Sequence, residues 1–357
     1  MTALRPTPAD RVMRAAVGVL AALPRPVLRL LAGPARTVDG QVLDPEVRIG
    51  LRVLSLSPPK PFASQPVEVS RRTMDHEAWQ FGGRPLPVGG IEDHTVPADH
   101  GGIPVRLVRP PAAAGRPPLI VHFHAGGFAL GSIESHMPLA RFLAHHSGAA
   151  VLLVDYRLAP EHPFPAGHDD AVTAYGWALA QAERLGLSPR IAVTGDSAGG
   201  NLAVHVARTA RDRGLPAPAQ LVLLSPWLDL ASRRRSRTLF HDGYFLTVPD
   251  LEWYVRQLLP EAGTGGVGPD DPRVSPLRDP DLRGLPPTHL AYAGFDPLRD
   301  ESRDMAARLR EADVRVSERC WPGLVHPFCN TLGTGGSSRR AMLEVATILR
   351  TALDAPA

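Results

Sequence analysis

A serine between two glycines, near the middle of the chain, has the spacing of an activated nucleophile. Residues 190–205 read R-I-A-V-T-G-D-S-A-G-G-N-L-A-V-H, so Gly195 and Gly199 lie two positions before and after Ser197. A short apolar run typical of a buried strand precedes this motif, and good helix formers follow it. Strand, Gly-x-Ser-x-Gly and helix together indicate a nucleophile elbow, a strained turn that exposes the serine hydroxyl. The glycines are needed because a Cβ at either position would keep strand and helix apart.

A serine hydroxyl also needs a base and an acid that orients the base, and candidates for both follow it in the chain. Asp296 comes soon after the apolar run 288–292, and His326 lies beyond a later run of the same kind. Taken singly, the glycines can be an ordinary turn, the aspartate a helix cap and the histidine one of 14 without special meaning. Their order, each after an expected strand, favours a catalytic triad. Asp300 and Glu301 are less suitable acids, because they fall in the first turn of an expected helix.

A glycine pair earlier in the chain offers the backbone donors that acyl transfer requires. Residues 124–128 read H-A-G-G-F and follow another expected strand. Glycines let backbone N–H groups turn toward one point without side chains intruding. We therefore expect the N–H groups of Gly126, Gly127 and Ala198 to form an oxyanion hole. His124 precedes the serine in the chain and is expected to shape this loop.

The chain around these motifs alternates between strand-like and helix-like patterns. This alternation predicts an α/β fold, with a mostly parallel central sheet flanked by helices on both faces. In such sheets, functional loops lie at the carboxyl ends of the strands. The strands are expected at 91–96, 105–108, 119–123, 151–154, 191–194, 221–224, 288–292 and 314–318, and the main helices at 170–183, 198–211, 298–310 and 340–353.

The alternation is interrupted after residue 226. Thr247 and Asp250 form a capping-box pair ahead of an amphipathic helix, which predicts a helical insertion over the strand ends. We expect a cap built from residues 227–275 and 42–90, and a catalytic domain built from 91–226 and 276–357.

Aromatic residues are frequent in this insertion. The candidate substrate contacts are Phe245 in the insertion and Phe128 directly after the glycine pair. Two interpretations of the aromatic group stay open: it walls an acyl pocket, or it packs the cap against residues 42–60. The group consists of Tyr244, Phe245, Trp253 and Tyr254.

Residues 1–41 form an N-terminal extension with helical patterning. Four aliphatic residues share one helical face: Leu23, Val27, Leu30 and Leu31. Arg25 and Arg29 lie opposite, and a basic amphipathic helix of this kind can lie on a membrane surface. Such a face more often packs on its own protein. We expect packing, with peripheral membrane contact as the alternative.

The composition narrows the function classes. Hydrophobic residues make up 44% of the chain and charged residues 21%, as in a soluble globular protein, and the net charge is only +3. The arginines at 233–235 and 237 lack interleaved aromatics, which argues against nucleic-acid binding. Cys320 and Cys329 form no disulfide framework or metal motif and suggest free thiols in the cytoplasm. No apolar run reaches 18 residues, so no spanning helix is expected.

Together these features resemble the hormone-sensitive lipase family of α/β-hydrolase esterases. The matching segments are His124–Phe128, Asp155–Ala166, Gly195–Asn201, Asp296–Glu301 and His326, within roughly residues 42–355. The resemblance implies a serine carboxylesterase with a helical cap, without metal or cofactor. It implies the triad Ser197, Asp296 and His326, and oxyanion donors at Gly126, Gly127 and Ala198. One departure is Ala125, where the family usually has its first glycine. Because that position is not a donor, we expect the hole to survive.

The predicted activity is hydrolysis of small-molecule carboxylic esters with short to medium acyl chains, through an acyl-enzyme, by a monomer or homodimer. One alternative is a catalytically inactive ligand-binding protein on the same fold, which would be expected to have lost a triad member. Another is a lipase or an amidase with the same triad.

Arg157 and Glu161 are expected to tie a proline-rich loop to the domain.

Overall fold

Eight strands form one sheet, in the order β10-β9-β8-β7-β5-β6-β4-β3. The computed structural model describes residues 4–56, 60–111, 115–260 and 265–354. Strands β5 to β10 pair in parallel, whereas β3 and β4 add an antiparallel edge. The bounds are β3 Gly90–Val96, β4 Ile103–Arg109, β5 Leu119–Phe123, β6 Ala150–Val154, β7 Ile191–Asp196, β8 Gln220–Leu224, β9 Thr288–Phe295 and β10 Val316–Val325.

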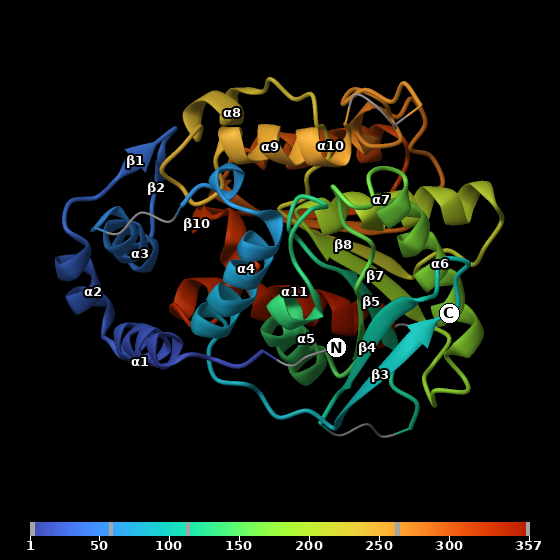
Figure 1. Ribbon diagram of the computed structural model, residues 1–357, viewed down its shortest axis with the longest axis horizontal. Coiled ribbons are helices and arrows are strands. Elements are labelled where there is room, and N and C mark those ends of the chain that lie inside the picture. The colour runs from blue at the N-terminus through green and yellow to red at the C-terminus, as the bar shows by residue number, and fades with distance from the viewer. Residues whose placement is uncertain (1–3, 57–59, 112–114, 261–264, 355–357) are drawn as a thin grey trace.

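Helices cover both faces of the sheet (Figure 1). One face packs against α6 (Ala166–Gln181), α7 (Ala198–Asp212) and α10 (Arg299–Glu311). The other packs against α5 (Ile133–Ser147) and α11 (Gly336–Asp354). Alternate residues of each strand serve the two layers: in β6, Leu152 faces the first and Val151 the second. Both layers are apolar, which explains why these strands are uninterrupted hydrophobic runs in the sequence.

The remaining helices lie over the carboxyl ends of the strands or beside β10. The first group contains α4 (Val67–Phe81), α8 (Arg235–Leu239) and α9 (Val248–Leu258), and α9 starts with the predicted capping box. The second contains α1 (Pro8–Ala22), α2 (Arg25–Ala32) and α3 (Pro45–Leu56), at the side of the molecule opposite the β3 edge (Figure 1). Short elements complete the chain: β1 Thr37–Val38, β2 Gln41–Val42, and the 3-10 turns Phe62–Ser64, Pro276–Arg278 and His326–Cys329.

Three helices were not predicted, α4, α5 and the short α8, whose Arg237 is buried against Glu301. Helix α5 contains Pro138 and is buried over most of its circumference, so its sequence has no clear polar face.

The predicted role of the proline-rich loop is supported by its contacts. Arg157 binds Asp170 of α6 through both carboxylate oxygens, and Glu161 binds Arg71 of α4 with an oxygen–nitrogen distance of 2.7 Å.

The prediction that the apolar face of residues 23–31 packs on the protein is wrong. Helix α1 does pack on α4, because Asp10 accepts hydrogen bonds from His76 and Gln80. Helix α2, however, buries only Leu28 and Ala32 and leaves Leu30 82% exposed. The stripe lies on the outside because α3 contacts the other face of α2. No single helix among the described residues is long and apolar enough to cross a membrane; α1 and α2 pass that test only together, across a bend of 117°.

Candidate active site

Ser197 lies at the turn between β7 and α7, with φ 54° and ψ −118°. Positive φ is uncommon for a residue with a side chain and stores strain. The backbone holds the turn: the Ser197 N–H donates to the Leu224 carbonyl, and the Trp227 N–H donates to the Ser197 carbonyl, both at 2.9 Å. A Cβ at Gly195 would collide with the carbonyl of Gly199. The two glycines of the motif are therefore required by backbone-to-backbone contact.

Asp296 and His326 lie on neighbouring loops, directly after β9 and β10. His326 Nδ1 lies 2.8 Å from Asp296 Oδ2. The other carboxylate oxygen accepts the Leu298 N–H at 2.8 Å, which sets the orientation of the fully buried Asp296 side chain. His326 and Ser197 line the same cavity. Ser197 and His326 thus share one space, and Asp296 lies behind His326, outside the lining of the cavity.

The glycine pair forms a tight reversal beside this space. Gly126 and Gly127 have φ of 121° and 60°, and the Leu130 N–H donates back to the Gly126 carbonyl at 2.8 Å. Within the described chain, the N–H groups of both glycines have no hydrogen-bond acceptor. Ala198 opens α7, where the first N–H groups of a helix also lack partners. All three predicted oxyanion donors therefore have N–H groups available for a ligand.

His124 supports this loop from behind. Its ring stacks on Tyr156 with a centroid distance of 4.2 Å, and its Nδ1 lies 2.8 Å from the Ala125 carbonyl oxygen. Burial lowers the pKa of His124 to about 3, so the ring is neutral at physiological pH. This environment fits the predicted structural role and not that of a catalytic base.

The cavity in front of Ser197 has a volume of about 740 Å³. Much of its wall is apolar and comes from the cap, including Leu54, Met74 and Leu246. Glu77 and Asp250 also line it, and burial raises the pKa of both carboxyl groups. A cavity with this largely apolar wall suits an uncharged ligand.

Comparison with known proteins agrees with this geometry. A family profile described as the alpha/beta hydrolase fold matches residues 120–330. The carboxylic ester hydrolase LipN of Mycobacterium tuberculosis is 39% identical over 95% of this chain and 91% of its own. An ethyl acetate hydrolase of Pseudomonas putida is 39% identical over 63% of this chain and 71% of its own. An ester hydrolase from the metagenome of Lake Arreo superposes with a TM-score of 0.82 at 35% identity, covering 87% of this chain and 98% of that one.

The chain belongs to the hormone-sensitive lipase-like family of α/β-hydrolases. The predicted fold and family are thereby confirmed. One departure from the family pattern can now be explained. The N–H of Ala125 donates to His136 Nε2 at 3.2 Å, so this N–H is already used inside the protein, although the residue also lines the cavity.

The acids that follow Asp296 serve the architecture of this hydrolase. Glu301 is fully buried and accepts the N–H groups of Leu228 and Asp229 at 2.9 and 3.0 Å. It also binds Arg237 at 2.7 Å. Asp300 accepts the Ser236 N–H at 2.8 Å. Both lie in the first turn of α10, as predicted, and both link it to the segment around α8.

A buried network around Asp196 was missed at the sequence level. Its Oδ2 accepts a hydrogen bond from Asn330 Nδ2 at 2.7 Å and lies 3.1 Å from His136 Nε2. Its Oδ1 lies 3.3 Å from His122 Nε2. Burial alone raises the pKa of Asp196, but His136 and His122 lower it well below its usual value. One ionised carboxylate therefore links the elbow, the oxyanion loop and the loop after His326. No local spacing reveals it, because the partners are 60 to 134 residues away.

The same cluster is the one group among the described residues with metal-ligand spacing. The ligand atoms of His122, His136 and Asp196 lie within 4.8 Å of one another. The lone pair of His136 Nε2 is already used by the Ala125 N–H. The set therefore fits an internal hydrogen-bond network better than a metal centre.

Both cysteines are free, as expected.

The aromatic candidates separate into two groups. Phe245 and Tyr254 line the cavity, and the Tyr254 ring lies so close to Gly127 that a Cβ there would overlap it. Tyr244 is buried against Phe295, with ring centroids 5.4 Å apart. Trp253 likewise packs, against Phe62 at 6.3 Å. Two of the four residues thus line the cavity, while Tyr244 and Trp253 pack against Phe295 and Phe62, which lie outside the predicted partner range 42–60.

Phe128 does not line the cavity, contrary to expectation. It is 2% exposed and packs in the core, 5.9 Å from Trp227 and 5.4 Å from His168 between ring centroids. The reason is the chain reversal after Gly127, which carries the following residue away from the ligand side.

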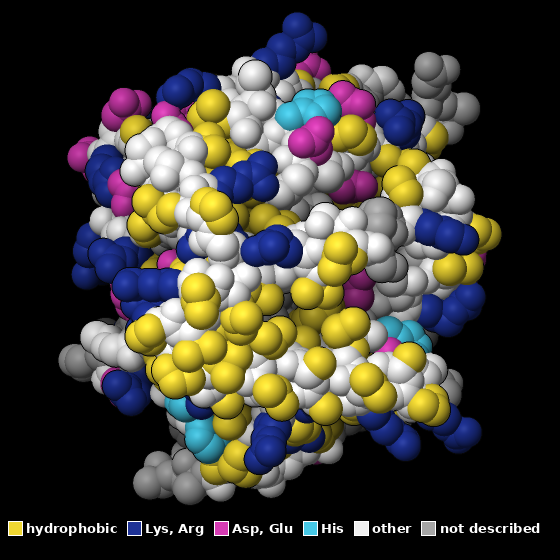
Figure 2. Space-filling view, turned by 90° about the vertical axis from the view of Figure 1, so that its left-hand side faces the viewer, with side chains coloured by type: hydrophobic (Ala, Val, Ile, Leu, Met, Phe, Trp, Pro, Cys, Tyr) yellow, Lys and Arg dark blue, Asp and Glu magenta, His cyan; other side chains and the backbone are white. Residues whose placement is uncertain are grey.

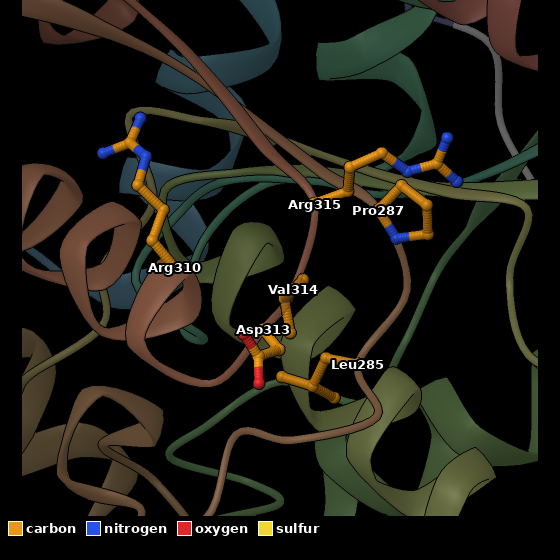
Figure 3. A pocket seen from close by; sticks show the side chains of 6 residues that line it. All are labelled: Leu285, Pro287, Arg310, Asp313, Val314 and Arg315. Carbon is orange, nitrogen blue, oxygen red and sulfur yellow. The ribbon is translucent and has the colours of Figure 1, made fainter.

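A second hollow lies at the amino ends of β9 and β10, beside the end of α10 (Figure 3). It is lined by Leu285, Pro287, Arg310, Asp313, Val314 and Arg315. The Asp313 carboxylate and the two arginine side chains are spread around it, and none of the predicted catalytic residues contributes (Figure 3). Its remaining lining residues, Leu285, Pro287 and Val314, have no side-chain group that could take part in catalysis.

Replacing Asp196 by Asn should destabilise the protein. The change keeps the shape of the side chain but removes the charge that its buried donors require, which costs on the order of 3 kcal/mol in the free energy of unfolding. Urea denaturation measures this. Asp212→Asn, at a carboxylate with a side-chain exposure of 57%, is the matched control and should change stability by less than about 0.5 kcal/mol. Equal effects of the two substitutions would contradict the role of the network.

Proposed function

We propose that the protein hydrolyses carboxylic esters, with Ser197 as nucleophile, His326 as base and Asp296 as orienting acid. The observation that carries the proposal is the 2.8 Å contact between His326 and the buried Asp296, beside the strained Ser197 in one cavity. The class of reaction is also that of the relatives, which are named as ester hydrolases. The alternative of an inactive binding protein is not favoured, because the relatives are named as ester hydrolases and none of the three side chains is missing from the sequence.

The reaction proceeds in two steps. The Ser197 oxygen attacks the ester carbonyl carbon while His326 takes its proton, and Asp296 stabilises the imidazolium. The negative charge on the carbonyl oxygen is stabilised by the N–H groups of Gly126, Gly127 and Ala198. His326 then protonates the departing alcohol. Water attacks the acyl-enzyme by the same route, which releases the acid and restores the serine.

The substrate is an uncharged ester with a short to medium acyl chain. The largely apolar cavity of about 740 Å³ accommodates such a molecule. Relatives are named ethyl acetate hydrolase and arylesterase, which fits small esters. The proposal includes action as a monomer or homodimer in the cytoplasm, with the N-terminal helices as a peripheral membrane contact.

Ser197→Ala should abolish ester hydrolysis and leave the fold intact, because alanine retains the Cβ of the elbow and removes only the attacking oxygen. Loss of a triad member costs on the order of 10⁴-fold in kcat. Release of p-nitrophenol from its acetate measures activity, and circular dichroism checks the fold. Retention of more than a few per cent of wild-type turnover would show that another group is the nucleophile.

Asp296→Asn should lower kcat by about 10⁴-fold, because the amide favours the wrong tautomer of His326. Asp300→Asn is the matched comparison: it should leave kcat within about threefold of wild type, since Asp300 binds backbone and arginine groups away from His326. Steady-state kinetics on proteins with similar melting temperatures tests the ranking. The opposite ranking would assign the orienting role to Asp300.

Phe245→Ala should shift preference toward longer acyl chains, because the ring lines the cavity and is 37% exposed. Its melting temperature should change little. The neighbouring Tyr244→Ala should instead lower the melting temperature and reduce activity on all esters alike, since Tyr244 is 3% exposed. p-Nitrophenyl esters from acetate to laurate, with thermal melts on the same samples, separate the two. A uniform loss in Phe245→Ala would remove this residue from the acyl pocket.

A further inference from the structure

The first three helices present an apolar face to solvent. Eight of the twelve large hydrophobic residues that are exposed in the described chain belong to α1, α2 and α3. Leu30 and Leu56 are 82% and 87% exposed, values at which a side chain has almost no protein contact. Figure 2 shows hydrophobic side chains gathered in a broad band on this side of the molecule, with basic side chains at its border. The eight residues are Val12, Met13, Val19, Val27, Leu30, Leu31, Val53 and Leu56. We refer to them as the N-terminal apolar face.

The charge around this face is mainly positive. Residues 1–56 contain eight arginines and four carboxylates, whereas the remaining chain contains 31 basic and 32 acidic side chains. Three of the four carboxylates are engaged within the protein. Asp10 binds His76, Asp39 binds Arg235 and Arg299, and Glu46 accepts N–H groups at the start of α11. Six of the arginines are exposed: Arg5, Arg11, Arg25, Arg29, Arg36 and Arg52.

An apolar face bordered by arginines matches an anionic lipid surface. Aliphatic side chains enter the boundary between headgroups and acyl chains, and guanidinium groups bind phosphates above it. A second copy of the chain is a poorer partner, because joining two such faces would bring like charges together. The bend of 117° between α1 and α2 also suits helices that lie along a surface.

The same face adjoins the cavity. Helix α3 contributes Leu54 to the cavity wall, while Val53 and Leu56 of the same helix are exposed on the outside. Phe245 lines the cavity, is 37% exposed, and contacts α3 near Gly50. An ester dissolved in a membrane would therefore have a short apolar path to Ser197.

We propose that the N-terminal apolar face docks the protein on anionic phospholipid surfaces and brings the cavity next to membrane-dissolved esters. The docking step depends only on the face. The supply of membrane esters to Ser197 rests on the function proposed above. Docking is therefore tested independently of catalysis.

The docking test is co-sedimentation of the purified full-length protein with vesicles. Wild type should bind vesicles of phosphatidylcholine mixed with phosphatidylglycerol at least about tenfold more tightly than phosphatidylcholine alone. Leu30→Ser/Leu31→Ser should weaken binding to the mixed vesicles on the order of tenfold or more, through lost apolar contact. Arg11→Gln/Arg29→Gln should do so through lost charge. Leu343→Ser, at an exposed leucine of α11, is the matched control and should bind as wild type does.

Vesicle binding and catalytic activity are measured separately, with one variant for each. Ser197→Ala should bind vesicles like wild type, and the Leu30→Ser/Leu31→Ser variant should hydrolyse dissolved p-nitrophenyl acetate at the wild-type rate. Failure of the wild type to sediment with mixed vesicles would overturn the proposal, whatever its activity. A dimer in light scattering that the leucine substitutions convert to a monomer, without vesicle binding, would instead assign the face to a second copy of this chain.

Discussion

A buried charge holds the catalytic loops of this protein together. Asp196 is 2% exposed, and an ionised carboxylate in such a place is stable only if donors surround it. Asn330 donates to its Oδ2, and the ring nitrogens of His136 and His122 lie 3.1 and 3.3 Å from its two oxygens, so three segments of the chain meet at this charge. Asp196 directly precedes Ser197, and His136 accepts the N–H one residue before the glycine pair. The positions of Ser197 and of the glycine pair thus depend on one electrostatic requirement.

Close backbone contacts provide the second constraint. A Cβ at Gly199 would overlap the carbonyl of Phe123, and one at Gly126 would overlap the carbonyl of Leu130. Such contacts leave the chain few ways to move around Ser197, whose own φ of 54° is retained at a cost in strain. The region is therefore rigid where charge develops during acyl transfer, and preorganised donors are most effective under that condition.

The cap and the N-terminal helices serve other needs. Helices α3, α4 and α9 line an apolar space beside Ser197, and Tyr254 of α9 lies against Gly127. The N-terminal helices contribute little to the core: α1 buries one residue, Asp10, and α2 buries two. Their attachment is mainly polar, through groups such as Arg48, which donates to the Gly33 carbonyl at 2.8 Å. An element held this way leaves its apolar side chains free for an outside surface.

The sequence alone determined the sheet, the elbow and the candidates for the triad. Each rests on local signals: apolar runs for buried strands, glycines two residues from Ser197, and acid and histidine directly after strands. Tertiary structure decided what depends on distant contacts. The Asp196 network joins residues up to 134 positions apart, and Phe128 turns into the core at a chain reversal. Helix α2 exposes Leu30 and Leu31 because it packs against α3 on its other side. Periodicity shows that a helix has an apolar side, but it does not show what that side meets.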